Sequence, residues 1–185
     1  MRMLQLILNL TSHFDLKQHE QFSGKKLQYF DPELNQSYIP YVVETSVGLD
    51  RLFLATLSAS LKNEILEDGS ERTVLSLPSA LAPYKVAVMP LTKKDGLPEK
   101  AQEIFNTLRM DFSCQYDEKD SPGKRYRRQD AIGTPYSIMV DHQTLEDNTV
   151  TIRDRDTMLQ ERVAISDLTS VIDTKVNIRT LLGQL

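Results

Sequence analysis

Residues 84–91 read YKVAVMPL, a continuous apolar run that decides how this 185-residue chain is organised. A run of this length without alternation is typical of a strand covered on both faces of a sheet. The stretch that follows, LPEKAQEIFNTL, spaces Ala101, Ile104 and Leu108 along one face of a helix and has a proline in its first turn. The two stretches together predict a strand–helix unit of an α/β domain.

Alternating strands and helices are expected downstream of this unit. Short strands are predicted at residues 112–116 and 135–141, and SPGKRYRR between them predicts a short helix. LEDNT reads as a turn between YSIMVD and VTIRDRD, which makes a hairpin, and QERVAIS gives one more strand. A last helix is expected with Ser166 as its N-cap. The order β-α-β-α-β-β-β-α predicts an α/β domain with a mixed sheet.

The residues before this domain have a different character. YIPYVVET, residues 38–45, predicts a short strand, Gly48 ends it, and an apolar stripe from Leu49 predicts a helix. EDGSERTVLSLPSALAPYK then has breakers and little periodicity, which is typical of a linker. We therefore expect two parts, residues 1–80 and 81–185.

Composition narrows the possible functions. The net charge is −4, so a nucleic-acid role must depend on a local basic surface. The single cysteine, Cys114, excludes an internal disulfide and fits a reducing compartment, so a cytoplasmic protein is expected. The opening MRMLQLILNLTS is too short for a membrane span and has no small-residue cleavage site. No membrane association is expected.

Two clusters of arginine are candidates for binding nucleic acid. KRYRR places Lys124, Arg125, Arg127 and Arg128 around an aromatic ring, a combination that suits phosphates and unstacked bases, although a solvated helix face would look the same. In TVTIRDRD, strand alternation puts Arg153 and Arg155 on one polar face. Surface ion pairs along an exposed strand are the alternative for this second cluster.

Other chemical signals are weak, with one exception. The three histidines lack the spacing of metal ligands, and a buried structural thiol is the expected role of Cys114, so no metal site is predicted. In ETSVGLDR, a turn brings Glu44 and Ser46 near Arg51, which could hold an ammonium group on one side and a phosphate on the other. A structural Glu44–Arg51 ion pair is the alternative.

ETSVGLDR, residues 44–51, resembles motif 3 of class II aminoacyl-tRNA synthetases. FDLKQH upstream, and LAPYKVAVMPL, GKRYRRQDAIGTPY and VDHQTLEDNTVTIRDRDTMLQERV downstream, are in the order found in dimeric bacterial-type glycyl-tRNA synthetases. This resemblance runs from about residue 14 to the end of the chain. It implies an anticodon-binding domain with a mixed five-stranded sheet and three helices, preceded by a strand–turn–helix remnant of the catalytic domain.

The resemblance also implies roles for individual residues. Arg51 contacts the ATP phosphates and is the catalytic residue of this chain, while Glu44 and Ser46 hold the amino group of glycine. Glycine anticodons contain two cytosines, and a carboxylate can accept a hydrogen bond from the amino group of cytosine. Asp130 therefore joins the five arginines as an anticodon reader. The implied partners are tRNA(Gly), glycine and ATP with Mg²⁺, with a homodimer expected and no cofactor held by this chain alone.

Two departures limit what the resemblance implies. NLTSHFDL lacks the arginine that family members usually have there, and motifs 1 and 2 are absent, so the chain alone is expected to be inactive. A non-catalytic binding protein with a synthetase-like domain, such as a polymerase accessory subunit, is the rival interpretation. Retention of Glu44, Ser46 and Arg51 argues against it. A free-standing anticodon-domain paralogue is a third possibility, but such a protein should not carry 80 residues of catalytic-domain tail.

Overall fold

The computed structural model describes residues 10–12, 14–44 and 47–183, and it divides the chain into two compact units, Met1–Ala55 and Thr56–Leu185. The division falls inside α2 (Leu49–Ser60). This helix confirms the one expected from Leu49. The sequence had placed the boundary near residue 80. Residues 56–80 belong to the second unit instead, and residues 61–75 form a hairpin that reaches into the stretch predicted as a linker.

The first unit consists of short elements. They are β1 (Leu10–Ser12), α1 (Phe14–Ser23), β2 (Tyr29–Asp31), β3 (Gln36–Tyr38) and β4 (Val42–Glu44). β1 pairs antiparallel with β4, and β2 pairs antiparallel with β3. The single strand expected over residues 38–45 is divided between β3 and β4. Pro40 lies in the gap and has no backbone N–H to donate to a strand ladder.

A two-stranded hairpin begins the second unit. β5 (Leu61–Ile65) starts directly after α2 and pairs antiparallel with β6 (Glu71–Leu75). The turn contains Asp68-Gly69, and Gly69 has φ of 77°, which glycine adopts without strain. An Asp-Gly pair between strands is a strong hairpin signal, so the linker prediction was wrong for these residues.

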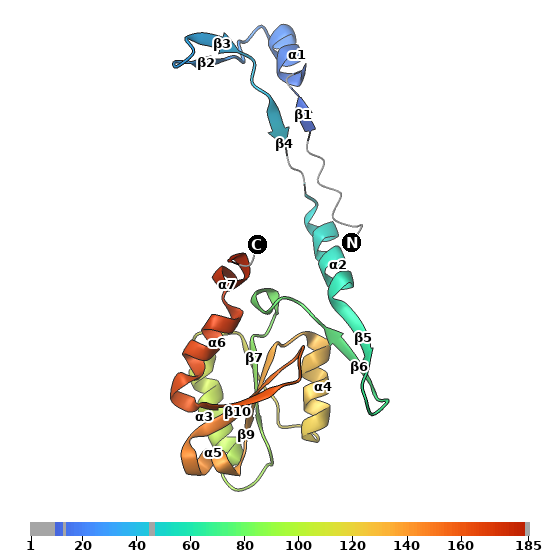
Figure 1. Ribbon diagram of the computed structural model, residues 1–185, viewed down its shortest axis with the longest axis vertical. Coiled ribbons are helices and arrows are strands. Elements are labelled where there is room, and N and C mark those ends of the chain that lie inside the picture. The colour runs from blue at the N-terminus through green and yellow to red at the C-terminus, as the bar shows by residue number, and fades with distance from the viewer. Residues whose placement is uncertain (1–9, 13, 45–46, 184–185) are drawn as a thin grey trace. The chain divides into compact units, whose positions relative to one another are not determined.

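The remaining elements of the second unit form the predicted α/β domain (Figure 1). They are η1 (Ser79–Leu81), β7 (Val86–Pro90), α3 (Leu97–Leu108), β8 (Cys114–Tyr116), α4 (Pro122–Ile132), β9 (Tyr136–Val140), α5 (His142–Asp147), β10 (Thr149–Asp154), β11 (Gln160–Ala164), η2 (Ile165–Asp167), α6 (Leu168–Val176) and α7 (Ile178–Leu182). The sheet order is β11-β10-β9-β7-β8. β7 is parallel to both β8 and β9, whereas β10 and β11 are antiparallel to their neighbours. The mixed five-stranded sheet is confirmed.

Both faces of the sheet are covered, as the run YKVAVMPL predicted. Val86 and Val88 point into the larger core with α3 and α6, while Ala87 and Met89 point to the other face, where Tyr126 of α4 packs. Figure 1 shows α3 and α6 on one side of the sheet and α4 on the other. These are the three predicted helices, and α5 and α7 are additional short ones.

Two local predictions need correction. The strands on either side of LEDNT pair antiparallel as β9 and β10, as predicted. The connection between them is not a simple turn, because Leu145, Glu146 and Asp147 belong to α5, which begins after Asp141 with a capping box: the Asp141 side chain accepts a hydrogen bond from the backbone N–H of Thr144. Ser166 is not an N-cap, because it lies inside η2, and Asp167 precedes α6 without a side-chain cap bond.

No helix in the described part of the chain is long and apolar enough to cross a lipid bilayer.

Candidate nucleic-acid interface

Asp130 lies in a buried ion cluster on the sheet face that α4 covers. Its carboxylate accepts hydrogen bonds from Arg153, at 2.9 Å from Nη1 and 3.2 Å from Nη2, and from Nη1 of Arg72 on β6 at 3.1 Å. Asp130 is 1% exposed and Arg153 6%. The guanidinium carbon of Arg153 also lies 4.8 Å from the ring centre of Tyr126. Asp130 and Arg153 therefore neutralise each other inside the domain.

Arg155 is also buried and has all its donors engaged. Its Nη1 donates to the carbonyls of Leu75 and Gly133, and its Nη2 donates to the carbonyl of Leu77. Nε and Nη2 bind the carboxylate of Asp156 at 2.9 and 2.7 Å. At 2% exposed, Arg155 ties the end of β6 to the end of β10 and has no donor left for RNA.

The three arginines of KRYRR differ from one another. Arg125 is 3% exposed and donates to the carbonyls of Pro90 and Asp120, so it holds loops together. Arg127 is half-buried and reaches Ser70 Oγ of the hairpin turn at 3.3 Å. Arg128 has a side chain that is 41% exposed and pairs with Asp117 and Asp120 at 2.9 and 2.8 Å.

The predicted anticodon surface is therefore only partly exposed. Of the six residues, Arg127 and Arg128 reach solvent, whereas Arg125, Asp130, Arg153 and Arg155 are buried and hydrogen-bonded within the protein. The alternation along β10 was right, since Val150 and Ile152 face the larger core. The polar face is not open, because α4 and the β5–β6 hairpin cover it, so the expectation of an exposed polar face is wrong; a role of these four residues in reading RNA stays a prediction.

A group of exposed lysines, interspersed with acidic side chains, lies where the parallel strands end. Along the chain, β7 is the first strand of this sheet. The next two strands pair with its two sides, β8 on one and β9 on the other, and α3 and α4 lie on opposite faces. Open α/β sheets bind ligands at the carboxyl ends of their strands at such a switch point. The loops after β7, β8 and β9 meet there, and we call this region the carboxyl edge.

Two side-chain contacts show that these three loops are adjacent. Lys93, after β7, lies 3.8 Å from the carboxylate of Glu118, after β8. His142, after β9, lies 3.8 Å from Asp95. The carboxyl edge carries exposed cationic side chains from the loops and from the first turn of α4, namely Lys93, Lys94, Lys119 and Lys124. Lys124 belongs to the KRYRR cluster that the sequence had singled out. Sequence reasoning missed the other three because they are dispersed along the chain and become neighbours only through the strand order.

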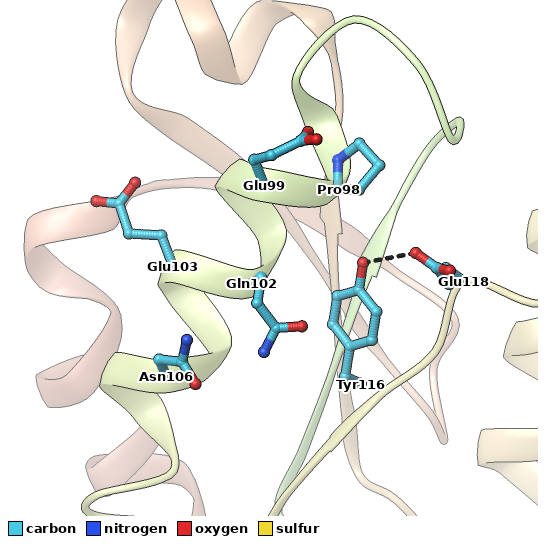
Figure 2. A pocket seen from close by; sticks show the side chains of 7 residues that line it. All are labelled: Pro98, Glu99, Gln102, Glu103, Asn106, Tyr116 and Glu118. Carbon is cyan, nitrogen blue, oxygen red and sulfur yellow. Dashed lines mark hydrogen bonds between the residues drawn. The ribbon is translucent and has the colours of Figure 1, made fainter.

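A surface pocket of about 600 Å³ opens beside the carboxyl edge, between α3 and β8 (Figure 2). Glu99, Gln102 and Asn106 line it from α3, and Tyr116 lines it from β8. The hydroxyl of Tyr116 donates to Glu118 at 2.9 Å, and burial, together with this carboxylate, raises the pKa of Tyr116 to about 12. The pocket offers hydrogen-bond acceptors to an amino group and one aromatic ring.

The residues of ETSVGLDR are described only in part. Glu44 is the last residue of β4, where its backbone pairs with Leu10, and Arg51 lies exposed in the first turn of α2. Ser46 lies outside the described residues. The predicted approach of Glu44 and Ser46 to Arg51 stays a prediction.

Among residues 10–12, 14–44 and 47–183, no three His, Cys, Asp or Glu side chains are placed to hold a metal ion. Burial raises the pKa of the Cys114 thiol to about 11, so the thiolate needed for nucleophilic attack is scarce at neutral pH.

Comparisons with known proteins agree with the fold of the second unit. Residues 85–175 match the anticodon binding domain family. A glycine–tRNA ligase of Clostridium tetani (strain Massachusetts / E88) is 53% identical over 163 residues, which are 88% of this chain and 35% of that protein. The ligase of Borrelia hermsii (strain HS1 / DAH) is 50% identical over 166 residues, 89% of this chain and 37% of that protein. The chain thus spans about a third of the length of these relatives.

A solved structure supports the same fold. The RNA binding domain of threonyl-tRNA synthetase from Cryptosporidium parvum Iowa II superposes with a TM-score of 0.50 at 23% sequence identity. The match covers 55% of this chain and 26% of that one.

Proposed function

Because this chain belongs to the glycyl-tRNA synthetase family and carries its anticodon-binding domain, we propose that it serves the ATP-dependent charging of tRNA(Gly) with glycine. The observation that carries this proposal is the identity of about half the residues to glycine–tRNA ligases over 88% of the chain. The second unit binds the anticodon loop, and the first unit contributes motif 3 to an active site completed by residues outside this chain.

At that active site we assign roles by residue chemistry. Arg51 stabilises charge on the ATP phosphates, while Glu44 and Ser46 accept hydrogen bonds from the ammonium group of glycine. Mg²⁺ enters with ATP, and we assign no metal ligand among the described residues. A homodimer in the cytoplasm is part of the proposal.

The anticodon site is proposed at the carboxyl edge and its pocket. Lys93, Lys94, Lys119 and Lys124 bind backbone phosphates there, a contribution that is electrostatic and independent of sequence. Arg127 and Arg128 stay in the proposed site because they reach solvent. Carboxylate and amide oxygens of Glu99, Gln102 and Asn106 accept from the amino groups of unstacked cytosines.

A non-catalytic binding protein is the rival function, and it predicts RNA or DNA binding without any need for Arg51. To distinguish the two functions, the part of the Clostridium tetani ligase that this chain does not cover is fused to this chain. We call the fusion the joined ligase. We expect glycine-dependent exchange of pyrophosphate into ATP, and loss of that exchange in Arg51→Ala. Exchange that persists in Arg51→Ala removes Arg51 from the active site, and absence of exchange in the parent favours the rival.

The anticodon site is tested in the 185-residue chain with a fluorescent anticodon stem-loop of tRNA(Gly). In Lys93→Ala/Lys94→Ala, affinity for the stem-loop should fall. The negative slope of log binding constant against log salt concentration should become shallower by about 1.4, since each single-strand phosphate contact contributes about 0.7. Lys25→Ala/Lys26→Ala is the matched control, because it removes two adjacent exposed lysines from the first unit. Equal losses in both double variants, or equal binding of a loop without cytosines, would overturn the site.

A further inference from the structure

The β5–β6 hairpin is attached to the anticodon-binding domain by close backbone contact. Gly133, at the end of α4, has φ of 85°, and a Cβ built there would lie 2.9 Å from the carbonyl oxygen of Leu75. Arg155 donates to that same carbonyl and to the carbonyl of Leu77. Only a glycine allows α4 to end this close to β6, so the hairpin is packed as part of the domain.

Arg72 joins the hairpin to the domain through a single buried guanidinium. On the hairpin side, its Nε donates to Glu64 of β5 at 2.8 Å. On the domain side, its Nη1 donates to Asp130 at 3.1 Å and to the carbonyl of Arg155 at 3.0 Å. Arg72 is 3% exposed although it comes from an edge strand of a two-stranded hairpin. The planar fork of arginine makes these contacts at once, which the point charge of a lysine cannot do.

The hairpin also continues directly into the helix that carries Arg51. α2 ends at Ser60 and β5 begins at Leu61, with no residue between them. The backbone N–H of Ser76, which follows β6, donates to the carbonyl of Ser60 at 2.7 Å. Both ends of the hairpin are therefore fixed at the end of α2, and its middle is fixed to α4 by Arg72.

We propose that Arg72 is a positioning residue for tRNA charging: it makes the end of the motif 3 helix, the hairpin and the anticodon-binding domain one rigid body. This inference rests on the proposed function, in which one tRNA must reach both the anticodon site and the active site. Arg72 touches neither proposed site. Its role is to hold the hairpin, and with it the last residues of α2, at one place on the domain that carries the carboxyl edge.

The test uses Arg72→Met, which leaves Asp130 paired with Arg153 and so avoids an unpaired buried carboxylate. Thr73→Val is the matched control: Thr73 is the next residue of β6, and its hydroxyl bonds Asn63 across the hairpin. Gly133→Ala is a second variant that displaces β6 by contact and changes no charge. Each is made in the 185-residue chain and in the joined ligase.

Hydrogen exchange in the 185-residue chain measures the attachment itself. In Arg72→Met, we expect the backbone amides of β6 to exchange at least about tenfold faster, while the amides of β7 and β9 keep the parent rate. A tenfold change in the opening equilibrium corresponds to about 1.4 kcal/mol. Thr73→Val should leave β6 close to the parent. Equal acceleration of β6, β7 and β9 would mean that Arg72 only stabilises the fold, and it would overturn the proposal.

Kinetics in the joined ligase measure the consequence. In Arg72→Met and Gly133→Ala, kcat for charging tRNA(Gly) should fall about tenfold or more, because small misplacement of reactants is costly. Glycine-dependent pyrophosphate exchange and stem-loop affinity should stay within about twofold of the parent. Unchanged charging, or a loss explained by weaker stem-loop binding, contradicts the positioning role. Absence of exchange in the parent instead contradicts the proposed function, and hydrogen exchange then still decides whether Arg72 attaches the hairpin.

Discussion

Replacing Asp130 with alanine is expected to lower the thermal stability of the protein sharply while leaving its affinity for RNA unchanged. Asp130 is the shared carboxylate of two buried arginines, Arg72 and Arg153, at distances of 2.9 to 3.2 Å. Removing one partner of a buried ion pair costs about 3–5 kcal/mol, because the remaining charge stays buried without compensation. For a chain of 185 residues, each kcal/mol lowers Tm by about 2–4 °C, so a decrease of about 6–20 °C is expected.

The assay is thermal unfolding followed by circular dichroism, with stem-loop binding measured well below the transition. Asp120→Ala is the control, since Asp120 pairs with Arg128 on the surface and such pairs contribute about 0–1 kcal/mol. The reasoning is refuted if Asp130→Ala melts within about 2 °C of the parent. Reduced RNA affinity at unchanged Tm would restore Asp130 as an anticodon reader, as the sequence had predicted.

Three further outcomes follow from single contacts. Gly133→Ala should cost more than about 1 kcal/mol in urea unfolding, because a residue other than glycine is strained at φ of 85° and its Cβ meets the carbonyl of Leu75; an unchanged midpoint would contradict this. Alkylation of Cys114 by iodoacetamide should be slow at pH 8 and should rise towards pH 11, whereas a midpoint near pH 8.5 would show an exposed thiol. A hydrogen bond from Arg162 holds the pKa of Asp141 below its ordinary value. This pair therefore stabilises the fold above about pH 3.9, and its contribution is lost as pH falls through the lower folded pKa. In acid unfolding, Asp141→Asn should make the free energy of unfolding depend less on pH, and an unchanged slope of that free energy against pH would refute the assignment.

The sheet could be predicted from the sequence because its strands and helices have distinct hydrophobic periods. Val86 to Met89 are buried on both faces of β7, and Ala101, Ile104 and Leu108 form the buried stripe of α3. The order of the strands could not be predicted in this way, because it depends on which crossovers pack and not on local pattern. The carboxyl edge, which exists only through that order, was therefore missed.

The burial of the arginines was not predicted, for a different reason. Alternation along β10 correctly put Arg153 and Arg155 on the face opposite Val150 and Ile152. Whether such a face is exposed depends on what packs against it. Here α4 and the β5–β6 hairpin, part of which had been interpreted as a linker, pack against the polar face of β10. The Asp68-Gly69 pair was the available signal for that hairpin, with Arg72 and Val74 as its buried alternation.

The distribution of lysine and arginine in this domain follows from their hydration. A guanidinium is weakly hydrated and has five donors in a fixed fork, so a buried Arg155 can satisfy three carbonyls and a carboxylate. An ammonium is strongly hydrated and is buried at a cost: Lys85 is held by the carbonyls of Ser79, Ala80 and Ala82, and burial lowers its pKa. Arginines therefore join the parts of the domain, and exposed lysines supply most of the positive charge at the carboxyl edge. In a chain of net charge −4, an RNA surface is then better located from lysines that the strand order gathers than from arginines adjacent in sequence.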